Sequence, residues 1–337
     1  MNRNPLSHLL ALSLLLAVAS VPGVTVGQEL QSLSGRVWVT NRTLNNIALF
    51  EAATGTVRGT APVGRAPTGI VAPPGTGKLY VSDEGSNTVS VLSASSLKLL
   101  ATIPTGPRPH HMGHDPSGRY VYVAEFGSNQ VGMIDTREDR RLMGLAASAS
   151  PTARTHAPFA AADGTLYAVS EGSNELAAID PAGGRLLWTM PVGNRPSEVL
   201  VTRDGRTAFV SVRNENKVKV VDLSSRAMVG EATVGTQPDT LSLTPDGRAL
   251  IVGLRGIPAQ AAILDTATLK VSWVEVGGTT TGHQWLSEDG RFAFMAVEGP
   301  GELGGVAVID IAQARLRVFY PYPRGGRPHG VYYQPGH

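Results

Sequence analysis

The sequence predicts an all-β protein, a seven-bladed β-propeller with four antiparallel strands in each blade. One repeat of about 42 residues occurs seven times, and each copy carries short apolar runs separated by turn residues. A glycine, usually preceded by Asp, links the first two strands of a repeat, which is typical of tight hairpins. These glycines are Gly118, Gly164, Gly205, Gly247 and Gly290. A third marker, the Asp that ends the third strand, keeps the same register: Asp135, Asp180, Asp222, Asp265 and Asp310.

The copy beginning at Pro109 shows the predicted strands most clearly. A strand over 109–115 leads through Pro116-Ser117-Gly118 into the strand 120–124, and a third strand covers 131–135. Alternating runs such as 217–221, with turn residues on both sides, indicate strands in the other copies. The repeat therefore predicts one blade per copy.

The first blade is predicted to contain both ends of the repeat region. The runs 37–40 and 47–50 match second and third strands, and no first strand precedes them. Residues 329–336 match an innermost strand and its turn. We therefore expect the two ends to pair in one blade, which removes open sheet edges.

The N-terminal residues 1–27 are interpreted as a secretory signal peptide, and residues 28–337 as a single propeller domain. Arg3 precedes the apolar run Leu9–Val18, which is short for a membrane span and is followed by small residues. An uncleaved membrane anchor is the alternative. We expect a secreted or periplasmic monomer with no membrane span after cleavage.

Charge and cysteine content exclude several classes of function. The 29 Lys and Arg residues are balanced by 27 Asp and Glu residues without a block of one sign, so a nucleic-acid partner is not expected. The chain has no cysteine, which excludes disulfides, thiolate metal ligands and c-type haem attachment.

Several segments carry a family resemblance. Trp38-Val39-Thr40-Asn41, Tyr80-Val81-Ser82-Asp83 and Tyr122-Val123-Ala124-Glu125, with Ser-Asn-x-Val runs after the last two, resemble the YVTN β-propeller repeat family. That family includes surface-layer and periplasmic proteins, and the resemblance covers residues 36–336. It implies the fold. The same repeat also resembles lactonases, the haem d1 domain of nitrite reductase and proteins with no known activity, so it does not fix the chemistry.

The candidate site consists of histidines at the start of the innermost strands. Counted from the turn glycines, His110, His156 and His329 fall in the first position, and His111 and His283 in the second. We expect the innermost strands to bring these five imidazoles to one mouth of the ring. Imidazole suits copper, zinc or iron, so the five histidines are candidate metal ligands, with Glu198 and Glu298 as candidate acid/base residues.

Three interpretations of this cluster stay open. The imidazoles can hydrogen-bond neighbouring blades or line a general ligand mouth, they can bind a divalent metal, or they can act in metal-free acid/base catalysis. The first leads us to expect a module that binds a small molecule or an envelope protein. The alternative is a metal-dependent lyase, oxidase or lactonase-like hydrolase.

Overall fold

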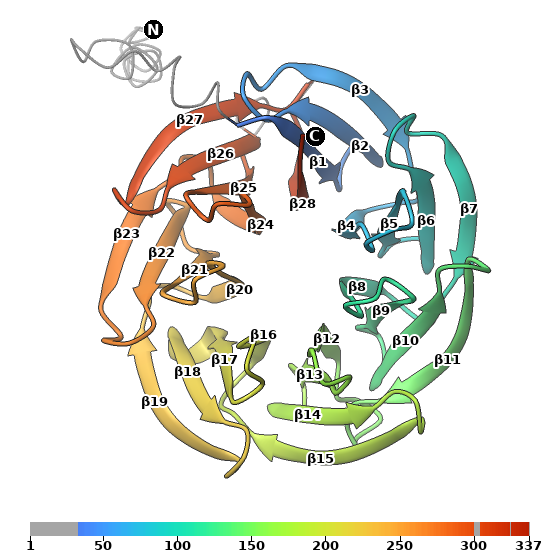
Figure 1. Cartoon of the computed structure of the whole chain (residues 1–337), viewed down its shortest axis with the longest axis vertical. Helices are drawn as coiled ribbons and strands as arrows, with labels where there is room; N and C mark the ends of the chain where they lie inside the picture. The colour runs from blue at the N-terminus through green and yellow to red at the C-terminus, as the bar shows by residue number, and fades with distance from the viewer. Residues whose placement is uncertain (1–32, 300–303, 324, 337) are drawn as a thin grey trace, which may run out of the picture.

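The computed structural model describes residues 33–299, 304–323 and 325–336. The predicted signal peptide at 1–27 lies outside the described residues. Within them, seven four-stranded antiparallel sheets stand around a central axis (Figure 1), as the repeat predicts. The described part also contains one short 3-10 helix, Arg213–Glu215, and no helix long and apolar enough to cross a membrane.

The innermost and second strands of the blades surround the axis. The innermost strands, from blade one to blade seven, are β28 (Pro328–Pro335), β4 (Pro67–Val71), β8 (Pro109–His114), β12 (Thr155–Ala160), β16 (Pro196–Val201), β20 (Pro238–Leu243) and β24 (Thr280–Leu286). The second strands, in the same order, are β1 (Gly35–Asn41), β5 (Lys78–Asp83), β9 (Tyr120–Glu125), β13 (Leu166–Ser170), β17 (Thr207–Val212), β21 (Ala249–Leu254) and β25 (Phe292–Glu298).

The third and outermost strands complete each sheet toward the rim. The third strands are β2 (Asn46–Glu51), β6 (Thr88–Ser93), β10 (Gln130–Asp135), β14 (Glu175–Asp180), β18 (Lys217–Asp222), β22 (Gln260–Asp265) and β26 (Gly305–Asp310). The outermost strands are β3 (Val57–Pro62), β7 (Leu99–Pro104), β11 (Arg140–Ala146), β15 (Arg185–Pro191), β19 (Ala227–Thr233), β23 (Val271–Glu275) and β27 (Arg315–Pro321).

Blade one contains both ends of the ring, as predicted. Strand β28 pairs antiparallel with β1 of blade one, whereas β27, the strand that precedes it in the sequence, belongs to blade seven (Figure 1). Tyr332 on β28 packs against Trp38 on β1, with ring centroids 6.0 Å apart. Tyr333 stacks on Phe294 of blade seven at 5.0 Å. The last strand therefore connects the first and seventh blades by side-chain packing as well as by hydrogen bonds.

The core lies between the faces of successive blades. Phe50 from blade one and Phe292 and Phe294 from blade seven share one buried cluster, and every interface around the ring has a comparable cluster. Apolar burial stabilises a protein by roughly 25 cal/mol per Å². Because each blade buries both faces against neighbours, the strands that surround the axis are held in place from both sides.

Candidate functional site

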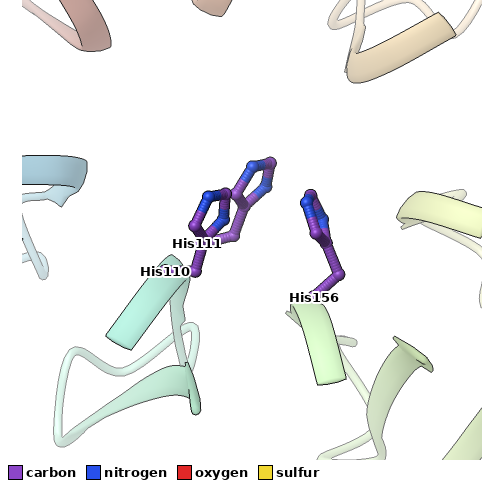
Figure 2. A group of neighbouring side chains, drawn as sticks. All are labelled: His110, His111 and His156. Atoms are coloured by element: carbon purple, nitrogen blue, oxygen red, sulfur yellow. The ribbon is translucent and has the colours of Figure 1, made fainter. Parts of the chain in front are cut away.

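The innermost strands bring all five predicted histidines together near the axis. His110 and His111 come from β8 and His156 from β12 (Figure 2), while His283 comes from β24 and His329 from β28. Neighbouring ring centroids lie 4.1 to 6.1 Å apart. Residues far apart in the sequence thus form one cluster, named here the histidine layer.

Strand register explains how the histidine layer is built. An extra residue interrupts the pairing of β8 between Pro109 and Met112, and the same irregularity falls between Thr281 and Gln284 in β24. His111 and His283 therefore occupy equivalent positions in blades three and seven, as the register counted from the turn glycines predicts. Their Nε2 atoms lie 3.0 Å apart.

Two histidines have their tautomers set by hydrogen bonds. The Nδ1 of His156 lies 2.6 Å from the carbonyl oxygen of Ser197, and because a carbonyl only accepts, Nδ1 carries the proton. Its Nε2 accepts a hydrogen bond of 3.1 Å from Arg213. The Nδ1 of His329 donates to Glu298 at 3.0 Å. In both rings Nε2 is therefore unprotonated, and Arg213 occupies that of His156 while that of His329 has no partner.

Other nitrogen atoms of the layer have no hydrogen-bond partner. These buried atoms are Nδ1 of His110, Nδ1 of His111 and Nε2 of His329. Burial lowers the pKa of all five imidazoles, that of His111 to about 4 and that of His329 to about 3. The rings are therefore neutral at physiological pH, which is the form that binds metals.

Above the histidine layer lies a cavity of about 270 Å³ that arginines dominate. It contains His110, His156 and His329 of the first position at its base. The arginines come from two positions of the repeat, the residue before the innermost strand and the residue after the second strand, although not every repeat has an arginine there. They are Arg42, Arg108, Arg154, Arg195, Arg213, Arg255 and Arg327, and we call the cavity that they line the arginine mouth.

Carboxylates pair with the arginine mouth but do not balance it. Arg42 and Arg108 bind Glu84, each at 2.6 Å. Glu298, which also lines the cavity, binds Arg327, and the other paired carboxylates, Glu171 and Asp239, lie outside its lining. Seven guanidiniums against four carboxylates leave a surplus of three positive charges. The neighbouring cations pull the pKa of Asp239 well below its usual range, despite a burial cost that acts the other way, so Asp239 remains ionised.

The arginine mouth was missed by the sequence analysis. Its members are scattered over the chain and balanced by acids elsewhere, so the sequence shows no basic block. A signal does exist, because Arg-Pro or Arg-Thr precedes four innermost strands: Arg108, Arg154, Arg195 and Arg327. Aligning the residue before each strand, as was done for the histidines, would have revealed it. The even distribution of charge along the sequence therefore does not hold for the surface of this mouth.

The two predicted acid/base residues occupy opposite ends of the cluster. Glu298 sits in the arginine mouth and binds Arg327 and His329, and burial is outweighed by these partners, so its pKa falls to about 2. Glu198 instead lines a separate cavity of about 530 Å³, together with apolar residues such as Val199, Leu241 and Trp285. Burial raises the pKa of Glu198 to about 8. The two carboxyl groups therefore do not face one shared pocket.

Glu198 nevertheless touches the histidine layer from below. Its Oε1 lies 3.8 Å from Nδ1 of His111, while its Oε2 accepts a hydrogen bond from the backbone of Leu241 at 2.6 Å. His114 lines the same cavity, and its Nδ1 lies 2.9 Å from the carbonyl oxygen of Asp115. Along the axis the order is arginine mouth, histidine layer, Glu198 and apolar cavity.

Comparisons with known proteins agree with this architecture. The model of the family described as Lactonase, 7-bladed beta-propeller matches residues 101–256, less than half of the chain. No curated protein is similar enough to count as a relative. The class that the fold defines is thus the seven-bladed β-propeller.

Several solved structures are similar in fold to this chain. The hydrazine synthase of Kuenenia stuttgartiensis has a TM-score of 0.69 at 20% identity, with 87% of this chain and 99% of that one covered. A protein of Bacteroides uniformis ATCC 8492, provisionally assigned as a 6-phosphogluconolactonase, has a TM-score of 0.72 at 16% identity, covering 90% and 100%. A functionally unknown protein of Desulfotomaculum acetoxidans DSM 771 reaches 0.74 at 13%, covering 89% and 99%. At these identities the likeness concerns the fold.

Proposed function

We propose that the chain is a ligand-binding propeller that holds a small anionic molecule in the arginine mouth. The observation that carries this proposal is the surplus of guanidiniums over carboxylates in one cavity. Guanidinium groups bind carboxylate and phosphate groups through paired hydrogen bonds, and they do so more strongly where water is partly excluded.

The exposure of individual arginines indicates which of them contact the ligand. Arg108, Arg154, Arg195 and Arg327 have side chains that are 41 to 54% exposed, whereas Arg213 is 8% exposed. The guanidiniums of Arg108 and Arg154 also lie over the ring of Phe126, at 4.9 and 4.5 Å. The outer four can thus turn donors toward a ligand, while Arg213 holds the wall of the cavity.

The volume of the cavity limits the size of the ligand. At about 270 Å³ it is slightly smaller than the pockets that hold drug-sized molecules, which begin near 300 Å³. A phosphorylated or multiply carboxylated metabolite fits this combination of volume and charge. The proposed setting is the periplasm or the cell exterior, as the N-terminal segment 1–27 and the resemblance to YVTN repeats suggest, with the chain acting as a monomer.

Calorimetry with 6-phosphogluconate, citrate and inorganic phosphate tests this function, with glucose as the uncharged control. We expect at least one of the three anions to bind, glucose not to bind, and the affinity to fall as salt is added. Arg154→Gln and Arg195→Gln should each weaken binding by about 10- to 100-fold, the value of one charge-assisted hydrogen bond. Arg185→Gln is the matched control, because Arg185 pairs with Asp180 on the outermost part of blade four.

Two outcomes would count against this function. If none of the three anions binds, or if the Arg154 and Arg195 variants bind as wild type does, the arginine mouth is not the ligand site. If 6-phosphogluconolactone is instead hydrolysed, and hydrolysis is lost in Glu298→Gln, the lactonase-like hydrolase takes the place of the binding module.

A further inference from the structure

The histidine layer contains buried nitrogen atoms that the anion-binding function does not use. His110 is only 9% exposed, and its Nδ1 is buried without a hydrogen-bond partner. A buried polar atom without a partner costs about 1–3 kcal/mol. Such atoms in a native site call for an explanation, and a bound ion is one.

The spacing of one imidazole pair matches the dimensions of a metal site, and the other imidazoles lie at somewhat longer distances. One nitrogen each from His110, His111 and His156 lies within 4.8 Å of the others. Nε2 of His283 lies 3.0 Å from Nε2 of His111. Two nitrogens bound to one ion at about 2.0–2.1 Å stand roughly 2.9–3.4 Å apart when their bond angle is about 90–109°. The His111–His283 pair already has this separation.

We propose that the histidine layer binds one transition-metal ion of the copper–zinc class, through His110, His111, His156 and His283. Imidazole nitrogen is a preferred ligand of both ions, and no thiolate competes because the chain has no cysteine. His329 adjoins the site, and Glu298 fixes its orientation. This proposal does not depend on the anion-binding function, since imidazoles would hold the ion and guanidiniums the anion, although His110 and His156 also line the anion-binding cavity.

A hydrogen bond behind one ligand prepares it for an ion, and a carboxyl group lies behind a second ligand. The carbonyl oxygen of Ser197 holds the proton of His156 on Nδ1, so that Nε2 offers its lone pair. Glu198 stands behind Nδ1 of His111, on the side away from His283. Carbonyl and carboxylate groups behind a ligating histidine orient the ring and increase its basicity.

Binding at His156 requires one local rearrangement, because Arg213 donates to the same Nε2. Arg213 keeps carboxylate partners after giving up this contact: its NH1 lies 2.6 Å from Glu171, and its NH2 contacts Asp239. The arginine therefore does not lose its charge compensation, so the cost of releasing His156 is that of one hydrogen bond.

Copper titration of the tag-free full-length chain tests the proposal. The protein is first stripped with a chelator, and Cu²⁺ uptake is then followed by electron paramagnetic resonance. We expect one ion per chain and hyperfine splitting from three or more nitrogens. His111→Gln, His156→Gln and His283→Gln should each weaken copper binding by at least about 10- to 100-fold, since even outer-shell changes have such effects. His114→Gln is the control, because His114 lies in the apolar cavity.

A second measurement guards against variants that merely fold poorly. Zn²⁺ should raise the melting temperature of the wild-type chain and of His114→Gln, because an ion that binds only the folded state stabilises it. It should not raise that of folded His111→Gln. The proposal is overturned if the wild-type chain takes up neither ion, or if the three site variants bind copper with the wild-type stoichiometry and spectrum.

Discussion

Arg213 donates a hydrogen bond to Nε2 of His156 over 3.1 Å, and this contact joins the arginine mouth to the histidine layer. The same guanidinium binds Glu171 and contacts Asp239, so it lies at the centre of a buried network of charges. Such a network is expensive to break, because removal of one partner leaves the opposite charge buried and less compensated. The side chains of the candidate site therefore also contribute to the stability of the fold.

Arg213→Gln should lower the free energy of unfolding by about 3 kcal/mol, the lower end of the range for breaking a buried ion pair. The lower end applies because Glu171 keeps Arg195 and Asp239 keeps Arg255. Urea unfolding measures the change. Arg185→Gln, on the outer surface, should leave the urea midpoint unchanged. An equal, small effect of both substitutions would show that the network adds little to stability.

Removal of the last strand should destabilise the whole ring. A chain ending at Arg327 loses every pairing between β28 and β1 and the packing of Tyr332 and Tyr333. It therefore exposes an edge of blade one and a face of blade seven. Thermal unfolding followed by circular dichroism should show a melting temperature well below that of the full-length chain. A truncated chain that melts with the full-length one would contradict the closure.

The substitution Gly330→Ala tests the closure of the ring through β28 with a smaller change than the truncation. A Cβ atom at Gly330 would stand 2.2 Å from the backbone oxygen of Thr68 in blade two, so Gly330→Ala must push the inner strands of these blades apart. We expect a loss of about 1–3 kcal/mol, as in overpacked cores. Gly59→Ala is the control, since its Cβ would meet only the end of the Leu97 side chain, at 3.3 Å.

Asp83 should make stability depend on pH between about 4 and 6. Burial raises its pKa to about 6 and outweighs the hydrogen bonds from Ser90 and Thr88, which favour the ionised form. In this range the folded chain holds a proton that the unfolded chain has released, so stability is lost as the pH rises to about 6. A shift of about two units corresponds to at most about 3 kcal/mol.

The variant Asp83→Asn isolates this contribution. The free energy of unfolding of the wild-type chain, minus that of the variant, should decrease from pH 4 to pH 7 and stay constant above that. Titration of the other carboxyl groups cancels in the difference. A difference that is flat across this range, or that rises with pH, would show that the folded-state pKa of Asp83 is not raised.

The fold could be predicted because its evidence repeats along the chain. The turn glycines Gly118, Gly164, Gly205, Gly247 and Gly290 all have a positive φ, the conformation that the Asp-Gly signal implies. The convergence of His110, His156 and His329 followed from the same register, since equivalent positions of a ring face one axis. Position in the repeat was therefore sufficient to locate these side chains.

Other features of the site could not be read from position alone. His111 and Glu198 share the second position of their strands, yet His111 turns into the histidine layer and Glu198 lines the apolar cavity. Side-chain rotation decides between these directions, and it depends on neighbours from other blades. The pairing of Arg213 with Glu171 joins residues 42 positions apart, and the sequence shows only that both follow a second strand.

The pairing of Gly35 with Pro335 places the first and last strands of the ring side by side. A short peptide could therefore link these two positions covalently, and the chain could be opened instead at a surface turn between two other blades. Such a circular permutant would keep every strand neighbour of the original ring. The order of the blades in the gene is thus separable from their order in space, and new termini could be placed away from the arginine mouth.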